Sequence, residues 1–246
     1  MLSRVLETEV MDTLAEAVDY DAIDHRAVNR AFVADLLAAR PGKGDRHLLC
    51  EAPEGPFRQK VPVTFSLPEE SEILDLGTGT ALIPIELCRQ WPAARVRAVD
   101  LAENMLEVAR RNVVKAGLGE QIRLEQVDAK GLPYGNGQFA TVMSNSIVHH
   151  LPDPWIVFQE AWRVAGPGGL LFLRDLMRPD DEATLRRLVE LYTVGANPHQ
   201  RQMFDDSLRA ALTVAEVRAL VARLGAEPDS VQPTSDRHWT WAARKG

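Results

Sequence analysis

The sequence has little cysteine, no surplus of positive charge and no long apolar run. Cys50 and Cys88 are its only cysteines, no CxxC pair occurs, and no histidines cluster at ligand spacing, which argues against disulfides and structural zinc. We expect two reduced intracellular thiols and no metal. No stretch of about 18 apolar residues is present, and the charged N-terminus lacks the apolar core of a signal peptide. The sequence therefore predicts a cytoplasmic protein with no membrane span.

Basic residues are too few to favour a polyanionic partner. Lysine and arginine total 28 against 35 aspartate and glutamate residues, which gives a net charge of −7. No overall field therefore draws the chain to nucleic acid or to an anionic membrane. With 46% hydrophobic residues over 246 positions, the chain can bury a sizeable core.

The N-terminal part has apolar residues at helical spacing. We expect helices over residues 3–40, because apolar side chains recur every three or four positions. The expected faces are Leu6, Val10, Leu14 and Val18 in the first helix, and Ile23, Ala27, Ala31, Ala34 and Leu37 in the second. Residues 41–70 hold five prolines and are typical of a connector. The sequence thus predicts a helical appendage and linker over 1–70.

From residue 71 onward, strand and helix patterns alternate. The strand candidates are, in order, EILDL, RVRAVD, IRLEQVD, FATVMSN and GLLFLRDL. Such alternation favours βαβ units, an α/β fold and a mostly parallel sheet with helices on both faces. A glycine-rich turn at 166–169 is expected to follow a helix over 155–164, residues 180–212 form a helical excursion, and the chain ends in a hairpin. Thr213 and Glu216 form a capping-box pattern, and Trp239 and Trp241 alternate as core residues of a strand.

The first strand candidate leads into a glycine loop, ILDLGTGTAL, at residues 73–82. Gly77 and Gly79 fit the glycine pattern of dinucleotide-binding loops, but Leu82 occupies the position of the third glycine. This weakens the prediction of a nicotinamide cofactor. Asp75 precedes the loop, and its carboxylate would repel a pyrophosphate but attract an ammonium group. The loop therefore favours a ligand with a cationic end.

Two further acids close the next strands. Asp100 ends the second strand, where a carboxylate can accept hydrogen bonds from both ribose hydroxyls. Asp128 ends the third, where it could accept a bond from the amine of an adenine. Carboxyl ends of parallel strands share one sheet edge, where ligands of such sheets bind. Three acids in succession along that edge, after a glycine loop, predict a nucleoside site.

Five segments together resemble the class I S-adenosylmethionine-dependent methyltransferases. They are DLGTGTA (75–81), VDLAENML (99–106), VDAKGLPY (127–134), SNSIVHHLPDP (144–154) and WRVAGPGGLL (162–171). The resemblance is greatest to the small-molecule branch that includes ubiquinone and menaquinone C-methyltransferases. It implies a Rossmann-like, mostly parallel seven-stranded sheet over residues 71–246, with S-adenosylmethionine as the cofactor. It also implies methyl transfer to an O, N or C nucleophile of a small molecule by in-line displacement. In related enzymes a helical appendage folds over the cofactor as a lid that excludes water, so the appendage here, with Tyr20 and His25, is either such a lid or an ordinary helix packed on the sheet.

The resemblance assigns roles to individual residues of this sequence. Asp75 would support the loop whose Gly77, Thr78 and Gly79 lie against the amino-acid end of the cofactor, and Asp100 would bind its ribose. The remaining cofactor residues would be Leu101 and Met105 flanking the adenine, Asp128 and Ala129 at its amine edge, and Asn145 and Ser146 facing the methionine portion. Thr80-Ala81 departs from the family, which often has glycine there. The (N/D)PP(Y/F) motif is replaced by SNSI, so nucleobase and glutamine methylation are disfavoured.

Adjacent histidines follow the fourth strand candidate. His149 or His150 could act as a general base, since an imidazole titrates near neutrality. Alternatively, one caps the following turn and the other packs beside the sheet. Asp175, at the end of the fifth strand, is a weaker candidate base, and His199 fits a surface position.

Alternatives to methyl transfer stay open at this point. A module that binds the cofactor without transfer fits the same motifs, because binding and turnover are separate properties. A nicotinamide-dependent oxidoreductase is disfavoured by the missing third glycine. Aminopropyl transfer lacks a distinctive polyamine-binding acid cluster. The acceptor and the oligomeric state are not indicated by the sequence.

Overall fold

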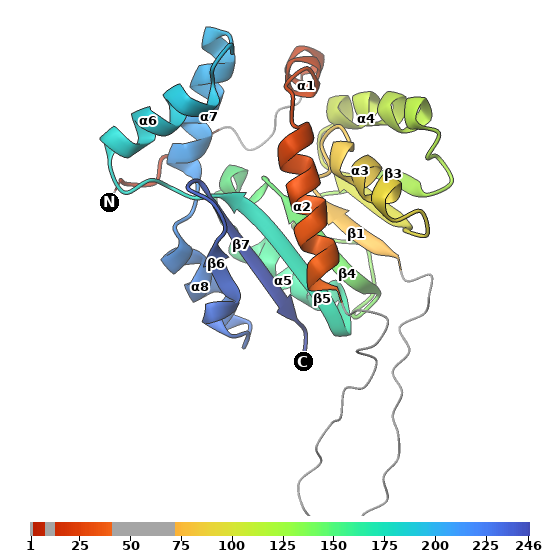
Figure 1. The fold of residues 1–246 in the computed structure, drawn as a ribbon. Coiled ribbons are helices and arrows are strands. Elements are labelled where there is room, and N and C mark those ends of the chain that lie inside the picture. Colours follow the sequence, from red (N-terminus) through yellow and green to blue (C-terminus); the bar gives the residue numbers. More distant parts are fainter. Residues whose placement is uncertain (1, 8–12, 41–71) are drawn as a thin grey trace, which may run out of the picture.

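A seven-stranded sheet forms the centre of the computed structural model, which describes residues 2–7, 13–40 and 72–246 (Figure 1). The strand order is β3-β2-β1-β4-β5-β7-β6. Strands β1 to β5 pair in parallel, and β7 runs antiparallel to both β5 and β6. The strands are β1 (Ile73–Leu76), β2 (Val96–Asp100), β3 (Ile122–Gln126), β4 (Phe139–Asn145), β5 (Ala165–Leu176), β6 (Val231–Pro233) and β7 (His238–Arg244). The expected Rossmann-like α/β fold is confirmed.

Helices cover both faces of this sheet (Figure 1). They are α1 (Leu14–Asp21), α2 (Arg26–Ala39), α3 (Leu82–Gln90), α4 (Glu103–Ala116), α5 (Trp155–Val164), α6 (Glu182–Tyr192), α7 (Pro198–Ala210) and α8 (Val214–Arg223), with 3-10 turns η1 (Val148–His150) and η2 (Pro228–Ser230). On one face, Phe158 of α5 and Val217 of α8 pack against Leu74 of β1. On the other, Phe32 of α2 and Ile85 of α3 pack in the core that includes Ile73.

The alternation of side chains in β1 explains this two-sided core. Leu74 and Leu76 belong to the α5–α8 core, while Ile73 belongs to the α2–α3 core. Successive residues of a strand point to opposite faces, so Asp75 lies on the same face as Ile73, beneath α2 and α3. A strand buried on both sides is expected for a parallel sheet. The carboxylate of Asp75, a candidate site residue, is therefore buried inside the protein.

Several local predictions for the C-terminal half are confirmed. Thr213 caps α8, with its hydroxyl oxygen accepting a hydrogen bond from the Glu216 amide, while the Glu216 carboxylate accepts one from the Thr213 amide. Trp239 and Trp241 are fully buried, and β6 and β7 form the expected antiparallel hairpin. Residues 166–169 were expected as a turn, but they belong to β5, whose pairing with β4 shifts register between Phe139 and Thr141. The glycines allow the strand to continue through that irregularity.

The N-terminal helix predictions are partly wrong. Residues 2–7 form no helix, and α1 begins only after Thr13, whose capping box with Glu16 starts it. Leu14 and Val18, expected on the packed face, are 46% and 49% exposed. In α2 the buried residues are Phe32, Val33 and Leu36, in place of the alanine face expected from Ala27, Ala31 and Ala34. A prediction from the spacing of apolar residues treats alanine like a larger apolar side chain. In the structure, the edge-to-face contact of Phe32 with Phe172 of β5 determines which face of α2 is buried.

Two predictions concern residues that lie wholly or partly outside the described ones. They are the linker with Cys50, and the first expected helix, which includes Val10. The division of the chain near residue 70 stays a prediction. Cys88, on α3, is a buried free thiol. None of the helices within 2–7, 13–40 and 72–246 is both long and apolar enough to cross a membrane.

Candidate active site

The loop between β1 and α3 has a backbone that only glycine accommodates well. Gly77 has φ +69°, and a Cβ placed there would lie 1.8 Å from Cγ2 of Ile147, on the segment after β4. Gly79 has φ +54°. Ala81, at the position where the family often has glycine, also adopts the left-handed region with φ 61°. The loop therefore keeps a glycine-like conformation at Ala81, at a cost of roughly 1–2 kcal/mol.

A cavity lies beside this loop, between the sheet edge and the N-terminal helices. It is lined by Tyr20, His25, Asn29, Asp75, Gly77, Thr78, Thr80, Leu82, Ile83 and Asn145. Elements far apart in the sequence thus meet here: α1, the start of α2, the glycine loop and the end of β4. Its position at the carboxyl ends of β1 and β4 agrees with the general location of ligands in open parallel sheets.

The cavity walls hold buried polar atoms without hydrogen bonds. Thr80 Oγ1 and His25 Nε2 make no hydrogen bond within the described residues, and Asp75 Oδ2 and Thr78 Oγ1 make none of good geometry, although the Thr78 hydroxyl is close enough to the Asp75 carboxylate to lower its pKa. Leaving a buried polar group unpaired costs about 1–3 kcal/mol. Four such atoms around one cavity indicate a polar ligand that offers both donors and acceptors.

Asp75 is the charged centre of this group. It is only 2% exposed, and burial raises its pKa to about 7, against the opposing effect of the Thr78 hydroxyl and with a smaller contribution from the negative charge of Asp100. A cationic group in the cavity would favour the ionised carboxylate and lower this pKa. The sequence-based expectation of a cationic ligand end therefore fits the electrostatics of the site.

Asp100 holds the loop from the neighbouring strand. Its Oδ2 accepts a hydrogen bond of 2.7 Å from the Gly79 amide, and its Oδ1 accepts one of 2.9 Å from the Ala102 amide. The Thr78 amide donates to the Val99 carbonyl oxygen at 2.9 Å. The first and second strand ends are thereby tied together, with Asp100 beside the glycine loop as the sequence predicts.

The other predicted cofactor residues are spread along the same edge. Met105 is buried on α4, where it packs with Ala17 and Tyr20 of α1. Leu101 is 39% exposed, and Asp128 caps a turn by accepting a hydrogen bond from the Lys130 amide at 2.9 Å. Of the predicted set, Asp75, Gly77, Thr78 and Asn145 line the cavity, while Gly79, Asp100, Leu101, Met105, Asp128, Ala129 and Ser146 do not.

Sequence reasoning missed part of the cavity wall. His25 and Tyr20 were noted only as members of a lid, and Asn29, Thr80, Leu82 and Ile83 were not assigned to the site. Thr80 lies within the glycine loop, so its position in the sequence could have identified it as a site residue. No sequence pattern indicated Asn29, because an isolated polar residue on a helix does not show which side of the helix faces a ligand. Burial and the nearby acids raise the pKa of Tyr20 to about 12, so its hydroxyl stays protonated at neutral pH.

His149 lies in a second, adjacent cluster. Its Nδ1 is 2.5 Å from Asp175 Oδ1, and the Asp175 carboxylate also accepts hydrogen bonds from the Val148 and Leu176 amides. Burial alone would lower the pKa of His149, but the Asp175 charge and hydrogen bond outweigh it and raise that pKa. Burial would likewise raise the pKa of Asp175, yet His149 holds it below its usual value. Each group therefore favours the charged form of the other.

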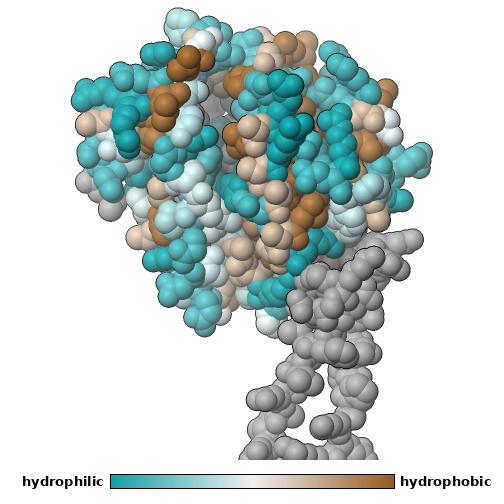
Figure 2. Space-filling view, in the orientation of Figure 1, coloured by the Kyte–Doolittle hydropathy of each residue, from teal (hydrophilic) through white to brown (hydrophobic). Residues whose placement is uncertain are grey.

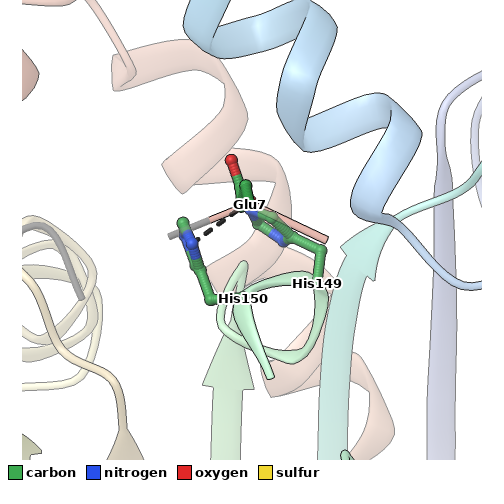
Figure 3. A group of neighbouring side chains, drawn as sticks. All are labelled: Glu7, His149 and His150. Carbon is green, nitrogen blue, oxygen red and sulfur yellow. Dashed lines mark ion pairs between the residues drawn. The ribbon is translucent and has the colours of Figure 1, made fainter. Parts of the chain in front are cut away.

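Glu7, from the N-terminal segment 2–7, faces the same two histidines (Figure 3). Its Oε1 is 3.4 Å from His149 Nε2 and 3.1 Å from His150 Nδ1. Arg4 fixes this segment by donating hydrogen bonds to the carbonyl oxygens of Ala210 (2.6 Å) and Leu151 (2.8 Å). Both ring nitrogens of His149 thus face carboxylates, which favours the packing alternative for that residue over a free base.

Comparison with known proteins agrees with this geometry. A family model described as a methyltransferase domain matches residues 73–169, which run from β1 into β5. Residues 73–169 are thus similar to methyltransferase domains. The glycine loop, Asp100, Asp128 and Asn145 all lie inside the matched methyltransferase domain. Tyr20, His25 and Glu7 lie outside it.

Relatives of the methyltransferase domain have several substrates in their names. The 27-O-demethylrifamycin SV methyltransferase of Amycolatopsis mediterranei is 28% identical over 176 residues, covering 70% of this chain and 61% of that protein. The ubiquinone/menaquinone biosynthesis C-methyltransferase UbiE of Desulfotalea psychrophila is 32% identical over 123 residues, covering 50% and 48%. The chain therefore spans about half to three fifths of the length of these curated relatives.

Solved structures share the fold. A candidate S-adenosyl-L-methionine-dependent methyltransferase from Methanococcus maripaludis has a TM-score of 0.65 at 18% identity, covering 96% of this chain and 95% of that one. A SAM-dependent methyltransferase from Aquifex aeolicus has a TM-score of 0.55 at 19% identity, covering 74% of this chain and 86% of that one. At this identity the likeness is one of fold.

Proposed function

We propose that the protein is an S-adenosylmethionine-dependent methyltransferase that methylates an oxygen, nitrogen or carbon nucleophile of a small molecule by in-line displacement. The observation that carries the proposal is the set of buried, unpaired polar atoms that line one cavity beside the glycine loop of a methyltransferase domain. An unpaired carboxylate oxygen and two unpaired hydroxyls suit a ligand end that carries both an ammonium and a carboxylate group.

The residues of the cavity fit the amino-acid end of S-adenosylmethionine. Asp75 would accept hydrogen bonds from the ammonium group, because its buried carboxylate lacks a counter-charge. The hydroxyls of Thr78 and Thr80 would donate to the carboxylate group. Asp100 would accept from the ribose hydroxyls, since each oxygen of a carboxylate can accept more than one hydrogen bond. Met105 would pack on the adenine from α4.

The chain's main contribution to the reaction would be orientation. When bound, the cofactor supplies a methyl carbon activated by the adjacent positively charged sulfur. An electron pair of the acceptor forms the new bond to that carbon, the carbon–sulfur bond electrons pass to sulfur, and a hydroxyl or amine acceptor loses its proton to solvent or a base. Holding the two reactants in line can supply on the order of 7 to 11 kcal/mol. The α1–α2 segment, which lines the cavity through Tyr20 and His25, would exclude water.

General-base roles for His149 and His150 stay a prediction. His149 has Asp175 on one ring nitrogen and Glu7 facing the other, so in this arrangement it offers no free nitrogen to an acceptor. The proposal therefore does not depend on either histidine as a base. Acceptors whose hydroxyl or carbon ionises easily would need none.

The acceptor we favour is a partly apolar small molecule with an acidic hydroxyl or carbon. Relatives are named for methylating 27-O-demethylrifamycin SV and for ubiquinone or menaquinone biosynthesis. Large apolar side chains are exposed on α1 and at the end of α6: Leu14, Val18, Leu191, Tyr192 and Val194. Figure 2 shows apolar residues at the top of the view on both the α6–α7 and the α1 sides. An apolar rim beside the sheet edge suits such an acceptor better than a polyanion.

Two measurements test the proposal in sequence. Isothermal titration of the pure protein with S-adenosylmethionine and S-adenosylhomocysteine should give one binding site, and the absence of binding to both would refute it. Transfer of radiolabelled methyl groups to a panel of phenols, hydroxyquinones and amines then tests turnover. Binding without transfer to any acceptor would favour a binding module, whereas enhanced fluorescence of NADH on mixing would favour the oxidoreductase.

A further inference from the structure

Glu7, His149 and His150 converge on one point although Glu7 is far from the histidines in the sequence (Figure 3). One potential ligand atom of each residue lies within 4.8 Å of the others. His149 and His150 come from η1, directly after β4, and Glu7 comes from the N-terminal segment that crosses above it. The cluster is shielded from solvent, since His149 is 4% exposed and the Glu7 side chain 15%.

The spacing of these atoms matches a metal coordination sphere. Glu7 Oε1 is 3.1 Å from His150 Nδ1 and 3.4 Å from His149 Nε2. Ligand atoms bound tetrahedrally at typical zinc distances are separated by about 3.3 Å. Neither contact counts as a hydrogen bond, and Glu7 Oε1 accepts none from any residue that the structure describes. A buried carboxylate oxygen therefore faces two imidazole nitrogens at distances that a shared metal ion would also give.

Residues behind the cluster hold the ligands in the orientation that a metal requires. Asp175 Oδ1 lies 2.5 Å from His149 Nδ1, which directs Nε2 of the same ring toward Glu7. Glu7 Oε2 accepts a hydrogen bond of 3.1 Å from the Ser207 hydroxyl, which leaves Oε1 directed at the histidines. A carboxylate behind a ligating histidine and a hydrogen bond behind a ligating carboxylate are the usual outer partners of metal sites.

From this geometry we propose that Glu7, His149 and His150 bind one divalent transition-metal ion, for which Zn²⁺ is the appropriate probe. Two imidazole nitrogens and one carboxylate oxygen form a donor set that suits Zn²⁺, Fe²⁺ or Co²⁺ better than Mg²⁺ or Ca²⁺, which prefer oxygen ligands. Three protein ligands leave a position for water. The sequence led us to expect no metal, because the third ligand lies in the N-terminal segment and not near the histidines.

The metal would join the N-terminal segment to the sheet edge. Arg4 already donates to the His149 carbonyl oxygen at 3.2 Å, and the Val5 amide donates to the Arg209 carbonyl oxygen at 3.2 Å. Ile147, two residues before His149, is the residue that a Cβ at Gly77 would strike. Metal binding would therefore fix a segment that contacts the glycine loop directly, whether or not the protein transfers methyl groups.

The test uses the wild-type chain freed of metal by a chelator. Isothermal titration with Zn²⁺ should show one tight site, and Co²⁺ should give the intense visible absorption of a four- or five-coordinate site with nitrogen and oxygen ligands. The weak spectrum of hydrated Co²⁺ together with no stoichiometric Zn²⁺ binding would overturn the proposal. Neither readout depends on a variant or on methyl transfer, so failure here leaves the proposed function standing.

Variants locate the metal. Glu7→Gln, His149→Ala and His150→Ala should each weaken Zn²⁺ binding at least about tenfold, and Asp175→Asn should weaken it roughly 10–100-fold. His199→Ala is the matched control, because His199 is exposed on α7, away from the cluster. Affinity unchanged in Glu7→Gln but reduced in His199→Ala would assign the ion to another part of the chain and reject the site. Circular dichroism of each variant separates lost binding from lost folding.

Discussion

Asp75 is the residue whose chemistry most directly reports the ligand. Its carboxylate is buried, has an unpaired Oδ2, and has a pKa raised to about 7 by burial. Part of the ligand-free protein therefore carries a proton on Asp75 between about pH 6 and 7. An ammonium group bound beside it would favour the ionised form, so binding would release this proton.

We predict that affinity for S-adenosylhomocysteine rises as the pH increases from about 6 to 7.5, with proton release at the lower end. Isothermal titration in buffers of different ionisation enthalpy measures the number of protons released. Asp75→Asn should bind more weakly and show no such release. Asp229→Asn, on a side chain 91% exposed, is the control and should keep the wild-type pH dependence. Equal proton release in wild type and Asp75→Asn would contradict the assignment.

Asp100 should be important for binding for two separate reasons. It accepts hydrogen bonds from the Gly79 and Ala102 amides, and it is the proposed ribose acceptor. Asp100→Ala should therefore weaken S-adenosylhomocysteine binding by about 1 to 3 kcal/mol or more, since it removes a charge-assisted bond and loosens the loop. Adenine or methionine alone would separate the two effects, because neither contains the ribose. Unchanged affinity for the whole ligand would reject the ribose role.

At the scale of elements, the glycine loop and the segment after β4 fit together closely. We predict that Gly77→Ala destabilises the protein more than Gly117→Ala, although both glycines have φ near +70°. Each substitution incurs strain of roughly 1–2 kcal/mol, but only at Gly77 does the new methyl group meet Ile147, which adds about 1–3 kcal/mol of overpacking. A Cβ at Gly117 has nothing within 4 Å among the described atoms.

Urea unfolding of both variants measures this difference. Ile147→Ala provides the internal check, because combining it with Gly77→Ala should recover part of the overpacking energy and none of the strain. If Gly77→Ala and Gly117→Ala cost the same, or if Ile147→Ala gives no recovery, the close fit between these two segments is wrong.

The elements also show where prediction from sequence succeeded. Strands β1, β4 and β5 could be predicted because parallel strands buried on both faces leave largely apolar runs. Strands β2 and β3 are less buried, and their alternation with helical patterns and the acids at or just after their ends indicated them. The packed faces of α1 and α2 could not be predicted, because many positions there are alanine, and only contacts such as Phe32 with Phe172 select the buried side. The contact of Glu7 with the histidines of η1 could not be predicted, because a single acid in a charged segment does not indicate which distant residues will lie beside it.

At the scale of the whole molecule, buried titratable groups make stability depend on pH in the ligand-free protein. Burial raises the pKa of Asp75 to about 7 and also raises that of Glu7. An acid whose pKa is higher in the folded state binds more protons there, so both groups lower the free energy of unfolding as pH rises above about 4.

The His149–Asp175 pair adds to this trend. The pKa of His149 is raised despite its burial, so its stabilising contribution is fully present below about pH 6.5 and is lost as pH rises through the folded value. The pKa of Asp175 is lowered despite burial, so its contribution is present above about pH 4 and is lost as pH falls through the folded value. Below about pH 6.5 the lowered pKa values of partly buried His25 and His238 oppose the trend set by Asp75 and Glu7. Metal-free, ligand-free protein should therefore lose stability as pH rises above about 6.5, where only the declining contributions act.

Urea unfolding in the presence of a chelator, from about pH 4.5 to 9, should show a free energy of unfolding that declines as pH rises above about 6.5. Asp75→Asn should flatten the decline below about pH 7, because it removes the group whose ionisation is disfavoured there. His149→Gln should flatten it above about pH 6.5, and His199→Gln, on the exposed side of α7, should leave the profile unchanged. A free energy that rises steadily from pH 5 to about pH 8 would mean that neither buried group titrates in the folded protein as its surroundings require.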